Sequence, residues 1–105
     1  MSPGKIASQA GHAYLHAFLA AQDLWPAQAA SYAADPPGTK VCLHGSLRAL
    51  IRAEEAAKAA GIPCFLVVDS GCPDFFDGKP TVTALGLGPA TKDQVQHITR
   101  RFNTL

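Results

Sequence analysis

The 105-residue sequence is poor in charge: Asp, Glu, Lys and Arg make up 16% of its residues, below the roughly one quarter usual in soluble domains. Its formal net charge is only +1, so nucleic-acid binding would have to depend on a local basic patch. The hydrophobic fraction of 48% is nevertheless high enough to form a core, which argues against a disordered or fibrous protein. We expect one globular domain over residues 1–105, because this length suits a single core.

The sequence also lacks the patterns of membrane insertion, secretion and metal binding. No stretch approaches the roughly 20 consecutive apolar residues of a membrane-spanning helix, and no apolar segment near the N-terminus ends in a cleavage site. The three cysteines, Cys42, Cys64 and Cys72, contain no CxxC pair. His12 and His16 have the i,i+4 spacing of a zinc-binding helix, but no third ligand accompanies them. We therefore predict a cytoplasmic protein with reduced thiols and no membrane span, metal or other cofactor.

Apolar periodicity and end signals predict three helices and one weaker helical segment. Residues 6–21 carry Ala at spacings of three and four, which indicates a helix with a packing face of small residues. A second helix is predicted over 46–61, with a serine cap at its start and glycine at its end. Thr91 and Gln94 have the spacing of a capping box at the start of the last helix. A short helix over 27–34 is also expected.

Three strands are predicted between these helices. Residues 40–44 alternate between apolar and polar character, as in a half-buried strand. Residues 64–68 form a continuous apolar run followed by Asp69, which favours a strand buried on both faces with a carboxylate at its end. Residues 81–87 form the third strand. The order of elements predicts an α/β fold, a three-layer α/β/α sandwich around a small mixed sheet.

Two stretches of the sequence share their motifs with one known family. Residues 4–13 match the pattern G-K-I-A-A-Q-x-x-H-A at every specified position except Ser8. The second stretch, from Asp69 to Pro89, begins D-x-G and keeps the spacing of the pattern T-V-L-x-I-G-P-G-P without a gap. On these residues the chain resembles the peptidyl-tRNA hydrolase 2 family, and the resemblance covers nearly the whole sequence.

The resemblance implies an activity and a set of site residues. The activity would be hydrolysis of the ester that joins a peptide to tRNA, which requires an activated water and stabilisation of a developing oxyanion, without a metal. Lys5 would bind a phosphate or the oxyanion beside backbone amides at the start of its helix, and His12 would transfer a proton or orient water. Asp69 would orient these groups or act as a base, and Thr81 would donate a hydrogen bond. A homodimer is also implied.

The chain departs from the family pattern in two places. Cys72-Pro73 replaces the usual Arg-Thr after D-x-G. The family strand that precedes the G-K-I helix has no counterpart, so the remaining strands close up, another chain fills the gap, or the true start lies upstream. These departures leave a second hypothesis: a catalytically impaired member that binds RNA or a protein partner.

Overall fold

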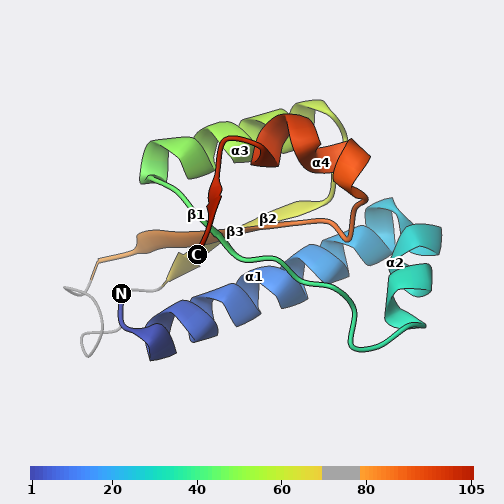
Figure 1. The fold of residues 1–105 in the computed structure, drawn as a ribbon, viewed down its shortest axis with the longest axis horizontal. Helices are drawn as coiled ribbons and strands as arrows, with labels where there is room; N and C mark the ends of the chain where they lie inside the picture. Colours follow the sequence, from blue (N-terminus) through green and yellow to red (C-terminus); the bar gives the residue numbers. More distant parts are fainter. Residues whose placement is uncertain (70–78) are drawn as a thin grey trace.

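A computed structural model describes residues 1–69 and 79–105, so Cys72 and Pro73 lie outside the described residues. The elements follow one another as helices α1 and α2, strand β1, helix α3, strands β2 and β3, helix α4 and strand β4 (Figure 1). Their bounds are α1 Pro3–Leu24, α2 Pro26–Ala33, β1 Leu43–His44, α3 Leu47–Ala59, β2 Cys64–Asp69, β3 Thr81–Leu87, α4 Lys92–Thr99 and β4 Asn103–Thr104. In the described residues, four helices and two small antiparallel sheets form an α/β fold, as predicted.

The helices start where side chains satisfy the otherwise unpaired amides of the first turn. Ser2 caps α1 and Ser46 caps α3, each accepting a hydrogen bond from a backbone amide three residues later. The predicted capping box of Thr91 and Gln94 is present at the start of α4. Helix α1 is longer than the apolar stripe predicted, because Pro3 is favourable in a first turn and adds no unsatisfied donor there.

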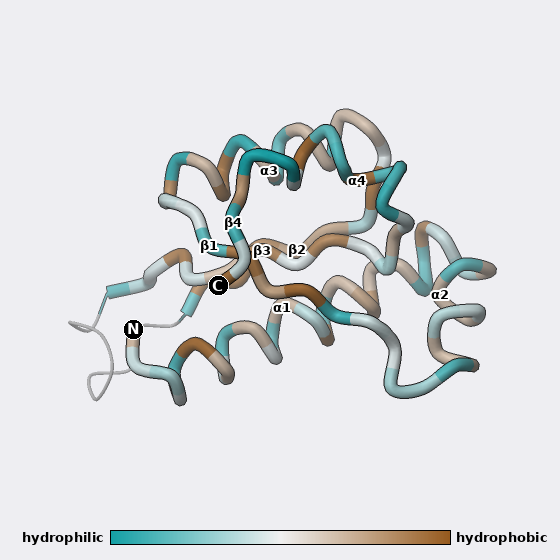
Figure 2. The backbone as a smooth tube through the Cα atoms, in the orientation of Figure 1, coloured by the Kyte–Doolittle hydropathy of each residue, from teal (hydrophilic) through white to brown (hydrophobic). Residues whose placement is uncertain are grey.

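The layers lie around the β2–β3 hairpin. Helix α1 covers one face of β2 and β3, while α3 covers the other face with α4 beside it (Figure 1). In Figure 2 the apolar positions (brown) gather along β2 and β3, and strongly hydrophilic positions (teal) gather on α3 and α4. Trp25, at the junction of α1 and α2, packs against the buried cluster of Ala53, Ala57, Ile62 and Ile98.

Small residues let α1 approach the sheet closely. Ala13, Ala17 and Ala21 are buried along the helix face that the alanine spacing predicted. Gly86 of β3 lies beneath them: a Cβ atom there would collide with the Ala13 carbonyl and come within 2.8 Å of the Ala17 Cβ atom. Glycine is therefore required at this position by close packing.

The strand pairing differs from the prediction in three respects. The described strands form two separate antiparallel pairs, β1–β4 and β2–β3, and no mixed sheet. Strand β1 is only two residues long, because residues 43–44 pair with the C-terminal Asn103–Thr104 and not with the hairpin. Strand β2 is not buried on both faces, since the side chains of Phe65 and Val68 are 39% and 54% exposed.

A β-bulge interrupts the β2–β3 pairing at Thr83. Val67 pairs with Ala84 and Val68 with Val82, so Thr83 is the extra residue on β3. Gly86 faces α1, and strict alternation from it would direct Ala84 toward α1 and Thr83 toward α3. The inserted residue breaks that alternation, and the Thr83 hydroxyl instead reaches a side chain of α1.

Candidate active site

The predicted site residues gather where the start of α1 meets the end of β2 and the start of β3 (Figure 1). Asp69 is the last residue of β2 and pairs across the hairpin with Thr81, the first residue of β3. Lys5 lies in the first turn of α1 and is half-buried. Gln9 follows Lys5 by one turn on the same face of the helix. The fold thus brings Lys5, Asp69 and Thr81 to one end of the molecule.

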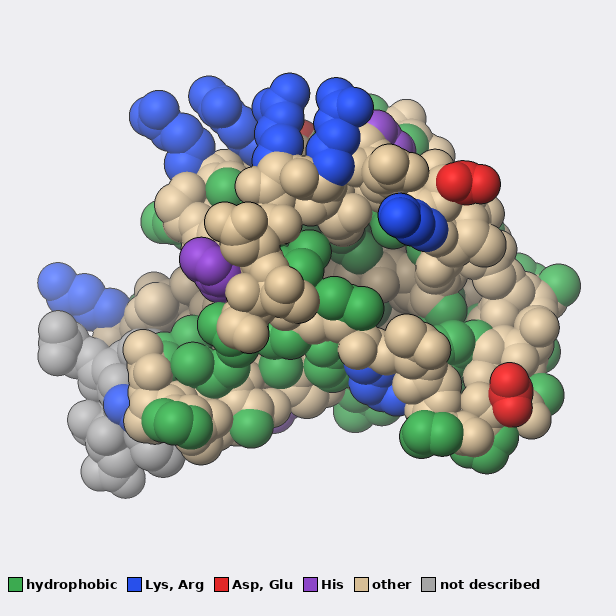
Figure 3. Space-filling model, in the orientation of Figure 1, with side chains coloured by type: hydrophobic (Ala, Val, Ile, Leu, Met, Phe, Trp, Pro, Cys, Tyr) green, Lys and Arg blue, Asp and Glu red, His purple; other side chains and the backbone are tan. Residues whose placement is uncertain are grey.

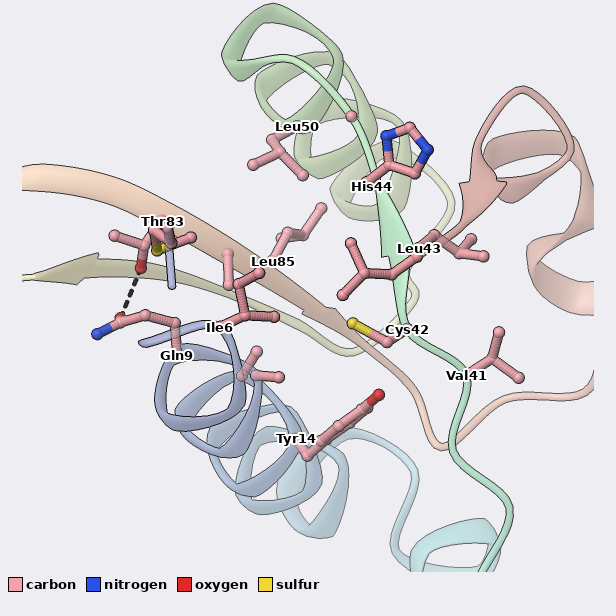
Figure 4. Close-up of a pocket in the computed structure, with 16 residues that line it drawn as sticks. Ile6, Gln9, Tyr14, Val41, Cys42, Leu43, His44, Leu50, Thr83 and Leu85 are labelled. Atoms are coloured by element: carbon pink, nitrogen blue, oxygen red, sulfur yellow. Dashed lines mark hydrogen bonds between the residues drawn. The ribbon is translucent and has the colours of Figure 1, made fainter. Parts of the chain in front are cut away.

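A chain of hydrogen bonds links α1 to both strands through Gln9. The Gln9 side-chain amide Nε2 donates to Asp69 Oδ2 at 3.2 Å. Its carbonyl Oε1 accepts from the Thr83 hydroxyl Oγ1 at 2.7 Å (Figure 4). Gln9 is only 7% exposed, and both of its polar ends are satisfied, as a buried amide requires. The hydroxyl of Thr83, which can only donate to Oε1, fixes the amide so that its NH₂ group points at the carboxylate.

This arrangement identifies two residues that the sequence prediction missed. The sequence prediction contains Gln9 only as part of the G-K-I-A-S-Q motif, and it does not include Thr83. The spacing of Gln9, four residues after Lys5 and four before the buried Ala13, was the available signal. No sequence signal indicated the bulge at Thr83.

The remaining predicted residues have simpler surroundings. The Thr81 hydroxyl donates to the Lys79 carbonyl at 3.0 Å, in an exposed bond. His12 is exposed on α1, and its role stays a prediction. The backbone amide of Lys5 is not available to a phosphate, because Ser2 Oγ already accepts from it at 3.3 Å.

Two aromatic rings stack between α1 and β2, further along α1 than His12. His16, one turn beyond His12, stacks on Phe65 of β2 with ring centroids 4.7 Å apart and an interplanar angle of 25°. Within the described ranges, no group of three His, Cys, Asp or Glu side chains is placed to hold a metal ion. No helix in this part of the chain has the length and apolar character needed to cross a membrane.

Comparison with known proteins identifies the family of the chain. The family model described as Peptidyl-tRNA hydrolase PTH2 matches residues 1–105. The chain belongs to the peptidyl-tRNA hydrolase 2 family. It is 39% identical over 100 residues to a peptidyl-tRNA hydrolase of Halobacterium salinarum, a match covering 94% of this chain and 84% of that protein.

Two further relatives match a similar share of the chain. The peptidyl-tRNA hydrolase of Methanopyrus kandleri is 34% identical over 99 residues, 94% of this chain and 83% of the relative. That of Methanococcus vannielii is 33% identical over 106 residues, all of this chain and 89% of the relative. These comparisons support the hydrolase hypothesis and give no support to the non-catalytic alternative.

Proposed function

We propose that this chain hydrolyses the ester bond of peptidyl-tRNA and releases free peptide and tRNA. The observation that carries the proposal is the hydrogen bond between Gln9 of the G-K-I-A-S-Q motif and Asp69 of the D-x-G motif. It joins the two most specific stretches of the family pattern in one polar cluster. Residues 1–105 act as one domain in this proposal.

Ester hydrolysis assigns a separate task to each residue of the cluster. The Asp69 carboxylate, held by Gln9, accepts a proton as water attacks the ester carbonyl. The Lys5 ammonium lies one helical turn from Gln9 and offsets the negative charge that develops on the carbonyl oxygen. His12 transfers a proton at the exposed side of the helix, and the Thr81 hydroxyl positions substrate. No cofactor is needed for these steps.

Release of free tRNA from a purified peptidyl-tRNA substrate tests this assignment. We expect Asp69→Asn and Lys5→Ala to lower kcat/KM by at least about 10²-fold, the usual contribution of a positioned acid, base or charge. Asp69→Asn keeps the size of the side chain and an oxygen that can still accept from Gln9. Asp23→Asn is the matched control, because Asp23 is exposed near the C-terminal end of α1, away from the cluster. Full activity in both site variants would refute the assignment.

The tRNA backbone is proposed to contact the α3–α4 layer. Arg48 and Arg52 on α3 and Arg100 and Arg101 after α4 are exposed, and Figure 3 shows basic side chains projecting along this side of the molecule. Phosphate contacts would make binding weaken steeply with salt. The double variant Arg48→Ala with Arg52→Ala should raise KM for peptidyl-tRNA while leaving turnover of a small N-acyl amino-acid ester unchanged. An equal effect on both substrates would refute tRNA contact here.

We propose that the protein acts as a homodimer in the cytoplasm. Its substrate, peptidyl-tRNA, arises where translation occurs, which supports the cytoplasmic location. The dimer is supported by the outer edge of β2, which carries the exposed Phe65 and Val68, because unpaired strand edges favour association. Sedimentation should show a dimer that Val68→Lys dissociates, and a monomer at high protein concentration would contradict the proposal.

A further inference from the structure

An exposed pair of aromatic rings lies between α1 and β2, apart from the cluster of Gln9 and Asp69. The ring of Phe65 on β2 stacks on the imidazole of His16 on α1, with centroids 4.7 Å apart and an interplanar angle of 25°. Phe65 remains 39% exposed, so the imidazole covers only part of its ring. A ring that is held on one side and open to solvent elsewhere presents a flat surface to a second planar group.

The ring pair lies on the same side of the hairpin as Asp69. Side chains an even number of residues apart along a strand share a face, so Phe65 and Asp69 both point toward α1. Phe65 meets His16 there, and Asp69 accepts a hydrogen bond from Gln9. The step from Phe65 to Asp69 along the strand is about 13 Å, and the step from Gln9 to His16 along the helix is about 10 Å. The rings therefore lie roughly 10–13 Å from the Asp69 cluster.

The helix face that joins the cluster to the rings suits a negatively charged ligand. Spacings of four, three and four residues place a lysine, a glutamine and two histidines on one face of α1: Lys5, Gln9, His12 and His16. Residues 3–22 of this helix include no Asp or Glu, and neither do residues 64–68 of β2. A polyanion that runs from the cluster to the rings along α1 and β2 therefore meets no carboxylate of these segments other than Asp69.

Single-stranded nucleic acid has the complementary chemistry. Its bases stack on aromatic rings whatever their sequence, and its backbone is negatively charged. The 3′ end of tRNA is unpaired, reads C-C-A and carries the ester on its terminal ribose. A strand advances by about 3.4 Å per nucleotide when its bases are stacked, and by more when it is extended, so the rings lie within a few nucleotides of the ester. An aromatic peptide side chain occurs in only some substrates, whereas these bases occur in all of them.

From this geometry we infer that Phe65, held in place by His16, binds the unpaired 3′ end of the tRNA by stacking on one of its bases. The inference rests on the proposed hydrolase function and adds a binding contact for the end of the tRNA that carries the ester. Val68, three residues from Phe65, points to the opposite face of β2. Base stacking at Phe65 and the proposed dimer contact at Val68 therefore use different surfaces.

The test is hydrolysis of peptidyl-tRNA substrates from which one base of the C-C-A end is removed while its sugar and phosphate are kept. With the wild-type chain, we expect one of these abasic substrates to have a KM raised by about tenfold, the effect of losing one stacked base. Phe65→Ala should raise the KM of the intact substrate by a similar factor. Removing the base should then cause no further increase, because its stacking partner is already absent.

Two further variants separate stacking from a merely structural role. Phe65→Tyr keeps an aromatic ring and should keep the tenfold abasic penalty. Leu24→Ala is the matched control, because Leu24 is a large apolar residue, 53% exposed, at the far end of α1. We expect Leu24→Ala to keep the wild-type penalty as well. Circular dichroism establishes that the variants are folded. A penalty that persists in folded Phe65→Ala would overturn the inference, because the base would then bind elsewhere.

The outcomes separate this inference from the proposed function. Hydrolysis with the same KM for every abasic substrate would leave the hydrolase function standing and overturn the stacking. No hydrolysis of any substrate by the folded chain would refute the hydrolase function, and the affinity for tRNA without a peptide would then decide on stacking: a tenfold weaker Kd for one abasic tRNA supports it, and equal Kd values overturn it.

Two other uses of the ring would also be visible. If Phe65→Ala changed only the preference between phenylalanine-containing and alanine-only peptides, the ring would bind the peptide and the inference would fail. If Phe65→Ala dissociated the dimer in sedimentation and kept the abasic penalty, the ring would serve subunit contact instead.

Discussion

Replacing Thr83 by valine would remove one hydroxyl while preserving the volume and β-branching of the side chain. The hydroxyl donates at 2.7 Å to Oε1 of Gln9, a residue only 7% exposed. Valine would leave this buried carbonyl oxygen without its partner, which costs about 1–3 kcal/mol. Each kcal/mol lowers the Tm of a domain of this size by about 4–8 °C. We therefore expect a Tm at least about 4 °C below that of the wild type.

The same substitution should affect catalysis through Asp69. Without the Thr83 hydroxyl, only the bond to Asp69 still orients the Gln9 amide, so its NH₂ group is held less firmly against the carboxylate. We expect kcat for peptidyl-tRNA to fall by about three- to tenfold, the equivalent of one hydrogen bond, with KM nearly unchanged. Thr83→Ser retains the hydroxyl and should restore most of kcat.

Thermal unfolding and single-turnover kinetics measure these two effects. Thr81→Val is the control for stability, because its hydroxyl donates to an exposed carbonyl that water can also satisfy. If Thr83→Val unfolds within 1 °C of Thr81→Val, the hydrogen bond to Gln9 contributes no stability. If Thr83→Val also keeps its full kcat, Thr83 does not position the Asp69 cluster, and the reasoning from the bulge fails.

Two further predictions concern packing and pH. Gly86→Ala should destabilise the fold by about 1–3 kcal/mol in urea unfolding, because the added methyl group would collide with α1. Gly11→Ala, which has open space around it on α1, should instead stabilise the fold by about 0.5–1 kcal/mol. Equal effects of the two substitutions would contradict the close approach of α1 to β3. Burial raises the pKa of the Cys64 thiol above its ordinary value of 9.0. The protonated thiol therefore contributes its full stability below pH 9.0, and this contribution is lost as the pH rises through the raised pKa. The unfolding free energy should therefore fall more steeply above pH 9 in the wild type than in Cys64→Ala, and parallel curves would argue against a perturbed thiol.

The sequence predicted helix and strand boundaries well where the signals that set them act between residues close in the sequence. The serine cap at Ser46 and the Thr91–Gln94 capping box are satisfied by near neighbours, so their helices begin where the sequence indicates. The span of β3 was predicted from its bounding prolines and glycines. The ion pair between Glu54 and Lys58, which are four residues apart on α3, has the same local character, with an N–O distance of 3.4 Å. These features depend on sequence separations of four residues or fewer.

The predictions that proved wrong concern features that depend on contacts between segments distant in the sequence. The pairing of β1 with Asn103–Thr104 joins residues about 60 apart, and two-residue strands carry no periodicity from which to predict it. The exposure of Phe65 depends on what covers β2, and an apolar run does not contain that information. The link from Gln9 to Thr83 required a register shift within the hairpin. Lys5, Asp69 and Thr81 were predicted because the family pattern marks them, and their proximity could be judged only from the fold.

The chain has one tryptophan, and its position makes it an optical reporter. Trp25 ends α1 yet packs against the cluster formed by α3, α4 and the segment between α3 and β2. Its fluorescence therefore senses whether the layer containing α1 is attached to the layer containing α3 and α4. Ellipticity at 222 nm senses helix content in both layers together. If both signals change at the same urea concentration, the layers unfold as one cooperative unit; a fluorescence change at lower urea would show that the layers separate while their helices persist.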